Sequence, residues 1–258
     1  MSDYESILVT SPVPGVAQVT LNRPGAANAL SPGLFNELAA ALKDIEKDDE
    51  IGCWILTGAP RLDGRPWFSA GADLKGFATR SPGDIDPSRV INDIDDSLKP
   101  SIAAIDGLCT TGGLELVLAC DMRVAAHTAQ FCDWHLSRLG AGIGAWGAAT
   151  RLARLVGTPK ATELLLTGDQ IDGAEAARIG LANRVVDSSD LLASAVALAA
   201  TIASKRSEGV RLTMEFLNQQ SMLSKHEALR LAERISSVMR IDRRFPDMMQ
   251  RVYERDKE

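Results

Sequence analysis

The residues best suited to chemistry are the glycines and the glutamate of the stretch Thr111–Glu115, which reads Thr-Gly-Gly-Leu-Glu. Two consecutive glycines at the start of a helix leave backbone N–H groups that an anion or a polarised carbonyl can approach. Glu115 lies in the first turn of an apolar segment that runs to Cys120, with no basic residue within a turn. A buried acid without a partner is costly and needs an explanation, which is often catalytic. The stretch therefore predicts half of an oxyanion hole beside a lone acid. The alternative is a tight helix start whose acid complements the helix dipole.

A second turn of small residues, Ser69–Asp73, follows an apolar strand that ends at Gly58. In an open α/β sheet, ligands bind beyond the carboxyl ends of the strands. We therefore expect the turns at Ala72 and Gly112 to face one cleft and to donate one N–H each. Two such donors are what the polarisation of a thioester carbonyl requires.

The elements that hold these turns alternate between strands and helices. A hairpin is expected at 7–21, and the helix start Ser31-Pro32 is followed by apolar residues at helical spacing up to Ile45. Further apolar strands are expected at 52–58, 101–105 and 122–126, with mostly helix after 144. This alternation favours an α/β fold with crossover connections. We place the mixed core at residues 1–190 and a C-terminal helical region at 191–258.

Composition narrows the classes of function. The 258 residues carry a net charge of −6 and no cluster of lysine and arginine, which argues against binding to nucleic acid or to a membrane surface. The four cysteines stand singly in apolar runs, so we expect buried thiols and no metal site. No apolar run is long enough to span a bilayer, and we see no secretory segment. We therefore expect a soluble, cytoplasmic protein.

Short motifs follow one another along nearly the whole chain, and each alone has little weight. They are Asn22–Pro24, Asn28–Leu30, Leu56–Gly58, Phe68–Asp73, Lys99–Pro100, Gly112–Leu116, Ala119–Asp121, Ala129–Phe131, Arg154–Gly157, Leu166–Gly168 and Gly180–Leu181. In this order and spacing they resemble the enoyl-CoA hydratase/isomerase (crotonase) family. The resemblance implies a spiral of ββα units with a C-terminal helical region that drives trimer formation, often with two trimers stacked.

The same resemblance implies an acyl-CoA substrate. The N–H groups of Ala72 and Gly112 would hold the thioester carbonyl and stabilise the enolate that forms at its oxygen. Coenzyme A then arrives as part of the substrate, so no separate cofactor is expected. The residues that would line or contact coenzyme A are Arg23, Ala26, Ala70, Asp73, Leu74 and Lys75, with Tyr253 and Arg255 contributed by a neighbouring subunit.

Glu115 matches the first of the two glutamates with which hydratases of the family activate water. The second normally follows a proline shortly after the Ala-Gln-Phe motif, but here residues 132–136 read Cys-Asp-Trp-His-Leu. Counting from Phe131 places His135 at that position, where it can act as an acid or a base near neutral pH. A slip of one residue would place Asp133 or Trp134 there instead, and the alternative role for His135 is packing beside Trp134 under a loop.

We therefore expect a lyase that adds water to a 2-enoyl-CoA, with Glu115 as the principal acid/base group and His135 as its partner. A double-bond isomerase that works with one carboxylate is the first alternative. A hydrolase or decarboxylase of an unusual, cyclic acyl-CoA is the second. A non-catalytic or RNA-binding relative that keeps the fold is the alternative from another class. The expected partners are the acyl-CoA substrate and further copies of the chain, as a homotrimer or homohexamer.

Overall fold

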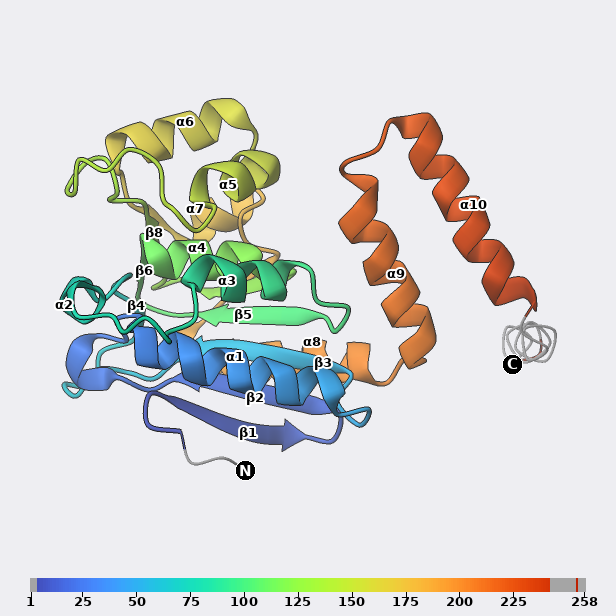
Figure 1. Ribbon diagram of the computed structural model, residues 1–258, viewed down its shortest axis with the longest axis horizontal. Coiled ribbons are helices and arrows are strands. Elements are labelled where there is room, and N and C mark those ends of the chain that lie inside the picture. Colours follow the sequence, from blue (N-terminus) through green and yellow to red (C-terminus); the bar gives the residue numbers. More distant parts are fainter. Residues whose placement is uncertain (1–3, 242–253, 255–258) are drawn as a thin grey trace. The chain divides into compact units, whose positions relative to one another are not determined.

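Figure 1 shows the protein as a computed structural model, which describes residues 4–241 and 254. The chain divides into two compact units after Ser207. The first unit contains two β-sheets and every predicted site residue that the structure describes. The mixed α/β fold that the sequence predicts is confirmed.

The larger sheet has six strands in the order β1-β2-β3-β5-β7-β10. Only β1 and β2 pair in the antiparallel sense, and the remaining neighbours are parallel. The strands are β1 (Ile7–Val13), β2 (Val16–Leu21), β3 (Cys53–Gly58), β5 (Ser101–Ile105), β7 (Met122–Ala126) and β10 (Arg184–Val186).

A smaller sheet of four short strands lies beyond the ends of the larger one, in the order β4-β6-β8-β9. Its members are β4 (Trp67–Ser69), β6 (Leu108–Thr110), β8 (Gln130–Cys132) and β9 (Ile171–Asp172). Along the chain, β3 and β4, β5 and β6, and β7 and β8 each contribute one strand to each sheet before the next helix. This repetition is the spiral of ββα units that the resemblance implies.

Both faces of the six-stranded sheet are covered, which explains why its inner strands are almost continuously apolar. In β3, Trp54 and Leu56 belong to one buried cluster, whereas Cys53 and Ile55 belong to the cluster on the opposite face. The second cluster is closed by α8 (Leu191–Ala203), which presents Leu191, Ala195 and Ala199 to the sheet. All four cysteines are buried free thiols, as the sequence predicts.

Four helices of the first unit begin at a side-chain cap, provided by Ser31, Asp73, Asp86 and Asp172. The hydroxyl of Ser31 accepts a hydrogen bond from the N–H of Leu34 (3.2 Å), and Pro32 opens α1, as predicted. The helix α3 (Pro87–Asp95) was not predicted; its Val90, Ile91 and Ile94 are buried within an otherwise polar stretch. The helices of this unit before α8 are α1 (Pro32–Lys47), α2 (Leu74–Ala78), α3 (Pro87–Asp95), α4 (Gly112–Ala119), α5 (Ala148–Val156), α6 (Thr158–Thr167) and α7 (Gly173–Arg178), with single 3-10 turns at Pro24–Ala26 and Ser188–Asp190.

The second unit consists, as far as the structure describes it, of α9 (Ser207–Gln220) and α10 (Lys225–Ile241). Ser224 and Glu227 form a reciprocal cap at the start of α10: Glu227 accepts from the N–H of Ser224 (2.9 Å), and the Ser224 hydroxyl accepts from the N–H of Glu227 (3.4 Å). The sequence analysis groups α8 with these helices, whereas α8 packs within the first unit. The domain boundary at 190/191 stays a prediction. Among the described residues, no helix combines the length and the apolarity that crossing a bilayer demands.

Candidate active site

The start of α4 lies against the turn that follows β4. A Cβ on Gly113 would lie 2.8 Å from Cβ of Ser69, and one on Gly112 would lie 3.2 Å from the backbone nitrogen of Ala72. A Cβ on Gly112 would also lie 2.5 Å from the Trp146 ring, so a side chain at either glycine would require its neighbours to move. Thr111, just before them, has φ of 51°, a conformation that L-residues rarely adopt outside functional turns.

This approach brings the two predicted oxyanion donors together. The N–H groups of Ala72 and Gly112 have their backbone nitrogens in one small region, at the end of β4 and at the N-terminus of α4. Within the described part of the chain, neither N–H donates to another backbone group outside regular helices and strands. Each is thus free to donate to a bound oxygen, and the dipole of α4 favours negative charge there.

Glu115 is buried, with 1 % of its surface exposed. Its Oε1 accepts hydrogen bonds from the backbone N–H groups of Trp146 (2.7 Å) and Ala148 (3.3 Å). Its Oε2 lies 3.6 Å from Nε2 of His135. The sequence predicts His135 as its partner, whereas the two N–H groups that hold its Oε1, at Trp146 and Ala148, were not predicted. Burial raises the pKa of Glu115, and the charge of His135 and the two N–H groups offset this only in part.

His135 lies between two carboxylates. Its Nδ1 is 3.0 Å from both Oδ1 and Oδ2 of Asp133, and its backbone N–H donates to the same Oδ1 (2.9 Å). Burial alone lowers the pKa of His135, but the hydrogen bond and charge of Asp133, with the charge of Glu115, outweigh burial and raise it. The structure therefore brings Glu115 and His135 together, as predicted, and adds Asp133.

Trp134, beside which His135 would pack in the alternative role, has partners of its own. The indole N–H of Trp134 donates to the carbonyl of Gly168 (3.2 Å), and the Arg138 guanidinium lies 3.2 Å from the centre of the Trp134 ring. His135 instead directs Nε2 toward Glu115. The other two histidines, His127 and His226, are exposed.

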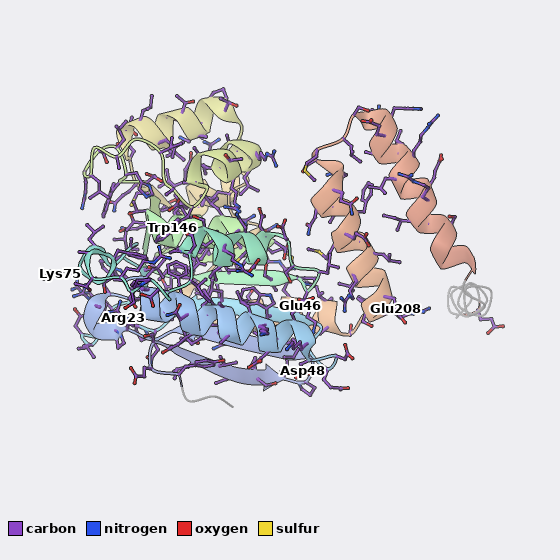
Figure 2. The ribbon with its side chains drawn as sticks, in the orientation of Figure 1. Arg23, Glu46, Asp48, Lys75, Trp146 and Glu208 are labelled. Atoms are coloured by element: carbon purple, nitrogen blue, oxygen red, sulfur yellow. The ribbon has the colours of Figure 1, made fainter. Side chains whose placement is uncertain are left out.

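A loop that the sequence analysis did not assign to the site closes it. A Cβ on Gly144 would collide with Oε1 of Glu115 and would lie 2.6 Å from Cε1 of His135, so the loop can pass here only as glycine. Two residues later, the Trp146 ring covers Gly112 and packs edge-on against Phe35, with ring centres 5.1 Å apart. Figure 2 labels Trp146 above the blue helix α1. A tryptophan between two glycines was the sequence signal that could have identified this loop.

The residues predicted to contact coenzyme A lie around η1 (Pro24–Ala26) and α2. The N–H of Ala70 donates to the carbonyl of Ala27 (3.0 Å), which ties the segment of Ala26 to the end of β4. Ala26 is exposed at its surface. Leu74 is 61 % exposed, and Lys75 lies at the outer edge of the molecule in Figure 2.

Arg23 and Asp73 have local partners in the structure. Arg23 pairs with Asp73 (3.0 Å) and donates to the carbonyl of Ala29. Asp73 caps α2 by accepting a hydrogen bond from the N–H of Gly76 (3.0 Å). This hydrogen bond and the nearby Arg23 hold the pKa of Asp73 below its usual value. Both assignments to coenzyme A stay predictions. Tyr253 and Arg255 lie outside the described residues.

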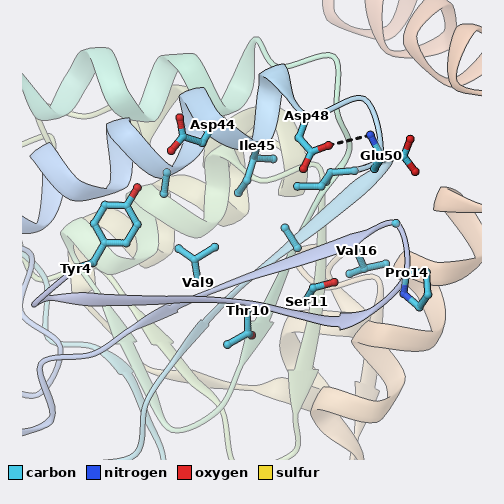
Figure 3. Close-up of a pocket in the computed structure, with 14 residues that line it drawn as sticks. Tyr4, Val9, Thr10, Ser11, Pro14, Val16, Asp44, Ile45, Asp48 and Glu50 are labelled. Atoms are coloured by element: carbon cyan, nitrogen blue, oxygen red, sulfur yellow. Dashed lines mark hydrogen bonds between the residues drawn. The ribbon is translucent and has the colours of Figure 1, made fainter. Parts of the chain in front are cut away.

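A separate apolar cavity of about 550 Å³ lies between the β1–β2 hairpin and α1. Figure 3 shows its wall, with Tyr4 at one end and the acidic residues Asp44, Asp48 and Glu50 along α1 and the loop after it. None of the predicted site residues lines it. The described residues also contain no cluster of three or more His, Cys, Asp or Glu side chains arranged to hold a metal ion.

Comparisons with known proteins agree with this geometry. The model of the family described as enoyl-CoA hydratase/isomerase matches residues 13–257. A probable enoyl-CoA hydratase of Mycobacterium leprae is 38 % identical over 219 residues, which cover 84 % of this chain and 82 % of that protein. The crystal structure of an enoyl-CoA hydratase from Bacillus anthracis aligns with a TM-score of 0.87 at 32 % identity, over 97 % of both chains. A monofunctional enoyl-CoA isomerase from Mycobacterium smegmatis aligns with a TM-score of 0.73 at 35 % identity, over 86 % of this chain and 97 % of that one. The chain belongs to the enoyl-CoA hydratase/isomerase family.

Proposed function

We propose that this protein adds water to a 2-enoyl-CoA to give a 3-hydroxyacyl-CoA. The observation that carries the proposal is the pairing of Glu115 with His135, 3.6 Å apart, beside the free N–H groups of Ala72 and Gly112. Hydration moves two protons at two positions: one leaves the water and one reaches C2. A site with two adjacent acid/base groups suits that need better than a site with one.

In the proposed reaction, the thioester oxygen accepts hydrogen bonds from Ala72 and Gly112, which withdraws electrons from the C2–C3 double bond. The oxygen of a water molecule bonds to C3 while its proton passes to Glu115, and the electron pair moves to the thioester oxygen as an enolate. Protonated His135 then gives the proton of Nε2 to C2, and the carbonyl re-forms. Transfer of the proton from Glu115 to His135, across the short gap between them, restores both groups.

The electrostatics support these roles. Burial raises the pKa of Glu115, which makes the carboxylate a stronger base than an exposed one. The two carboxylates beside His135 raise its pKa, which favours the protonated ring, the form that can donate the proton of Nε2. The N-terminus of α4 stabilises the negative oxygen without any change in its own structure.

A double-bond isomerase is the second candidate. It is favoured by the 35 % identity to the isomerase from Mycobacterium smegmatis, and by the firm anchoring of Oε1 of Glu115 on two N–H groups. A fixed carboxylate can carry one proton from C4 to C2 without help from His135. Assembly into a trimer or hexamer and binding of an acyl-CoA are also proposed; exposed leucines on the second unit, Leu217 and Leu229, support self-association.

A panel of 2-enoyl-CoA and 3-enoyl-CoA thioesters of several chain lengths tests the proposal, with products followed by mass spectrometry. Hydration adds one water, whereas isomerisation leaves the mass unchanged and moves the double bond. We expect a gain of one water from at least one 2-enoyl-CoA, and its loss in the variant Glu115→Gln. Conversion of 3-enoyl-CoA with no hydration of any 2-enoyl-CoA would refute hydration and favour the isomerase.

A further inference from the structure

We propose that Asp133 is a positioning residue, which holds the His135 ring with a proton on Nδ1 and with Nε2 facing Glu115. The inference rests on the proposed hydration, in which Nε2 delivers a proton to C2. Asp133 itself touches neither the oxyanion donors nor, in this proposal, the substrate. It acts through the ring that it holds.

The first argument is geometric. Asp133 grips His135 at two points, the backbone N–H (2.9 Å) and the ring Nδ1 (3.0 Å from each carboxylate oxygen). An ionised carboxylate only accepts hydrogen bonds, so Nδ1 must carry a proton wherever these contacts form. The ring then has no freedom to rotate, and Nε2 points at Oε2 of Glu115.

The second argument concerns burial. Asp133 is 1 % exposed, and, among the described residues, the hydrogen bonds to its carboxylate come from His135 alone. A buried carboxylate costs stability unless it is paired, and an apolar residue in its place is often neutral or stabilising. A carboxylate that serves one histidine alone is therefore poorly explained by folding, but it is well explained by control of that histidine.

The third argument links Asp133 to the oxyanion hole. Asp133 follows β8 directly, and the last residue of that strand, Cys132, accepts a hydrogen bond from the N–H of Thr111 (3.2 Å). Thr111 immediately precedes Gly112, and β8 pairs in parallel with β6, which leads into Thr111. The segment that carries Asp133 is thus fixed against the segment that carries the donor N–H and Glu115. The proposed acid His135 and the proposed oxyanion donor Gly112 are therefore held in fixed relative positions by the same pair of strands.

Electrostatics agree with this assignment. The charged groups that act on His135 are Asp133, at the end of β8, and Glu115, on α4; the loop after residue 143 presents Gly144 to the ring. Both acids favour the protonated ring, and Asp133 does so from the side away from Glu115. Removing the charge of Asp133 should therefore weaken proton retention by His135 without altering substrate contacts.

The variant Asp133→Asn tests the proposal, because its amide oxygen can still accept from the backbone N–H of His135. We expect kcat for hydration to fall by about 10²-fold, within the range that a proton-transfer group supplies, with KM little changed. Since His135 acts as the acid, the alkaline limb of the kcat profile should move to lower pH. The matched control is Asp172→Asn, on the strand paired with β8, because asparagine caps a helix as well as aspartate does. It should leave kcat and its alkaline limb unchanged. A wild-type kcat and alkaline limb in Asp133→Asn would overturn the inference, whatever its melting temperature.

Nitrogen NMR of the imidazole rings separates this inference from the proposed hydration. The chain has only three histidines, and the spectrum of His135→Gln identifies the signal of His135. We expect neutral His135 to carry its proton on Nδ1, and its titration to move to lower pH in Asp133→Asn. If both NMR results are found but no 2-enoyl-CoA is hydrated, the positioning role of Asp133 stands and the proposed hydration is refuted. A proton on Nε2 in the neutral wild-type ring would overturn Asp133, even if the variant failed to fold.

Discussion

The variant Glu115→Gln gives the sharpest test of the site because the structure predicts opposite effects on activity and stability. The glutamine Oε1 can keep both hydrogen bonds from Trp146 (2.7 Å) and Ala148 (3.3 Å), so the loop should stay closed. The amide group would then face Nε2 of His135 and can take no proton from water. Loss of one proton-transfer group costs roughly 10²–10⁴-fold in kcat. This corresponds to about 2.7–5.4 kcal/mol at about 1.36 kcal/mol per decade.

The effect on stability has the other sign. Burial raises the pKa of Glu115 in the folded state, so the folded protein holds that proton more tightly than the unfolded chain. The associated stability is present below the unfolded pKa and is lost as pH rises through the folded pKa. At neutral pH, an ionised Glu115 carboxylate in this buried position lowers the stability of the folded protein. Glutamine removes that charge, so Glu115→Gln should be at least as stable as the wild type.

Initial rates of water addition and thermal unfolding at neutral pH, measured on the same preparation, check both effects. Because Ala72 and Gly112 are untouched, KM should change by no more than about threefold, since uniform binding is retained. Glu163→Gln on α6, an exposed residue that pairs with Lys160, is the control for loss of one carboxylate and should change neither quantity. Equal losses of turnover, affinity and melting temperature in Glu115→Gln would refute the catalytic role and support a structural one.

Three further variants probe the remaining parts of the site. Gly112→Pro removes one oxyanion N–H, and kcat should fall by roughly 10²–10³-fold; wild-type turnover in a folded Gly112→Pro protein would exclude the donor role. His135→Ala should depress hydration strongly while sparing deuterium exchange at C2 that Glu115 can catalyse alone, as measured by mass spectrometry; unchanged hydration with a lowered melting temperature would remove His135 from the mechanism. Gly144→Ala places a methyl group against Oε1 of Glu115 and 2.6 Å from Cε1 of His135. Its turnover should therefore collapse, whereas Gly83→Ala, in open space, should behave as wild type in the same assay.

The sequence was sufficient for the parts of the fold that local chemistry determines. The helix at Pro32 follows from its cap and apolar spacing, and the continuous apolar run of β3 follows from burial on both faces. The short strands β4, β6 and β8 were not predicted, because three residues carry no usable periodicity and pair only with residues distant in sequence. α3 was missed since its three apolar residues are diluted by aspartates that face solvent.

The candidate site divides in the same way. Gly112 and Glu115 were predictable because a glycine pair and an acid stand together in one turn of helix. The hydrogen bonds to Glu115 were not, since Trp146 and Ala148 lie more than 30 residues away and their contribution is backbone N–H, which any residue except proline offers. The grip of Asp133 on His135 is local, and the spacing Asp-x-His was visible in the sequence. The sequence could not show that Nε2 of His135 points toward Glu115, because this depends on how β8 and α4 pack in the folded structure.

This contrast explains why the fold of the family would determine the proposed binding of the thioester group more firmly than the reaction that follows. The proposed oxyanion donors are backbone groups, so their positions depend on glycine at 112 and on the close approach of the turn at Ala72, and they tolerate much change elsewhere. The proton-transfer groups are side chains at the start of α4 and beyond the end of β8, where one substitution changes the charge and the pKa without moving a strand. A histidine held by Asp133 provides a cation opposite Glu115, which a second carboxylate would not. The choice between hydration and isomerisation therefore depends on whether that cation delivers a proton to C2, and this is what the His135 and Asp133 variants measure.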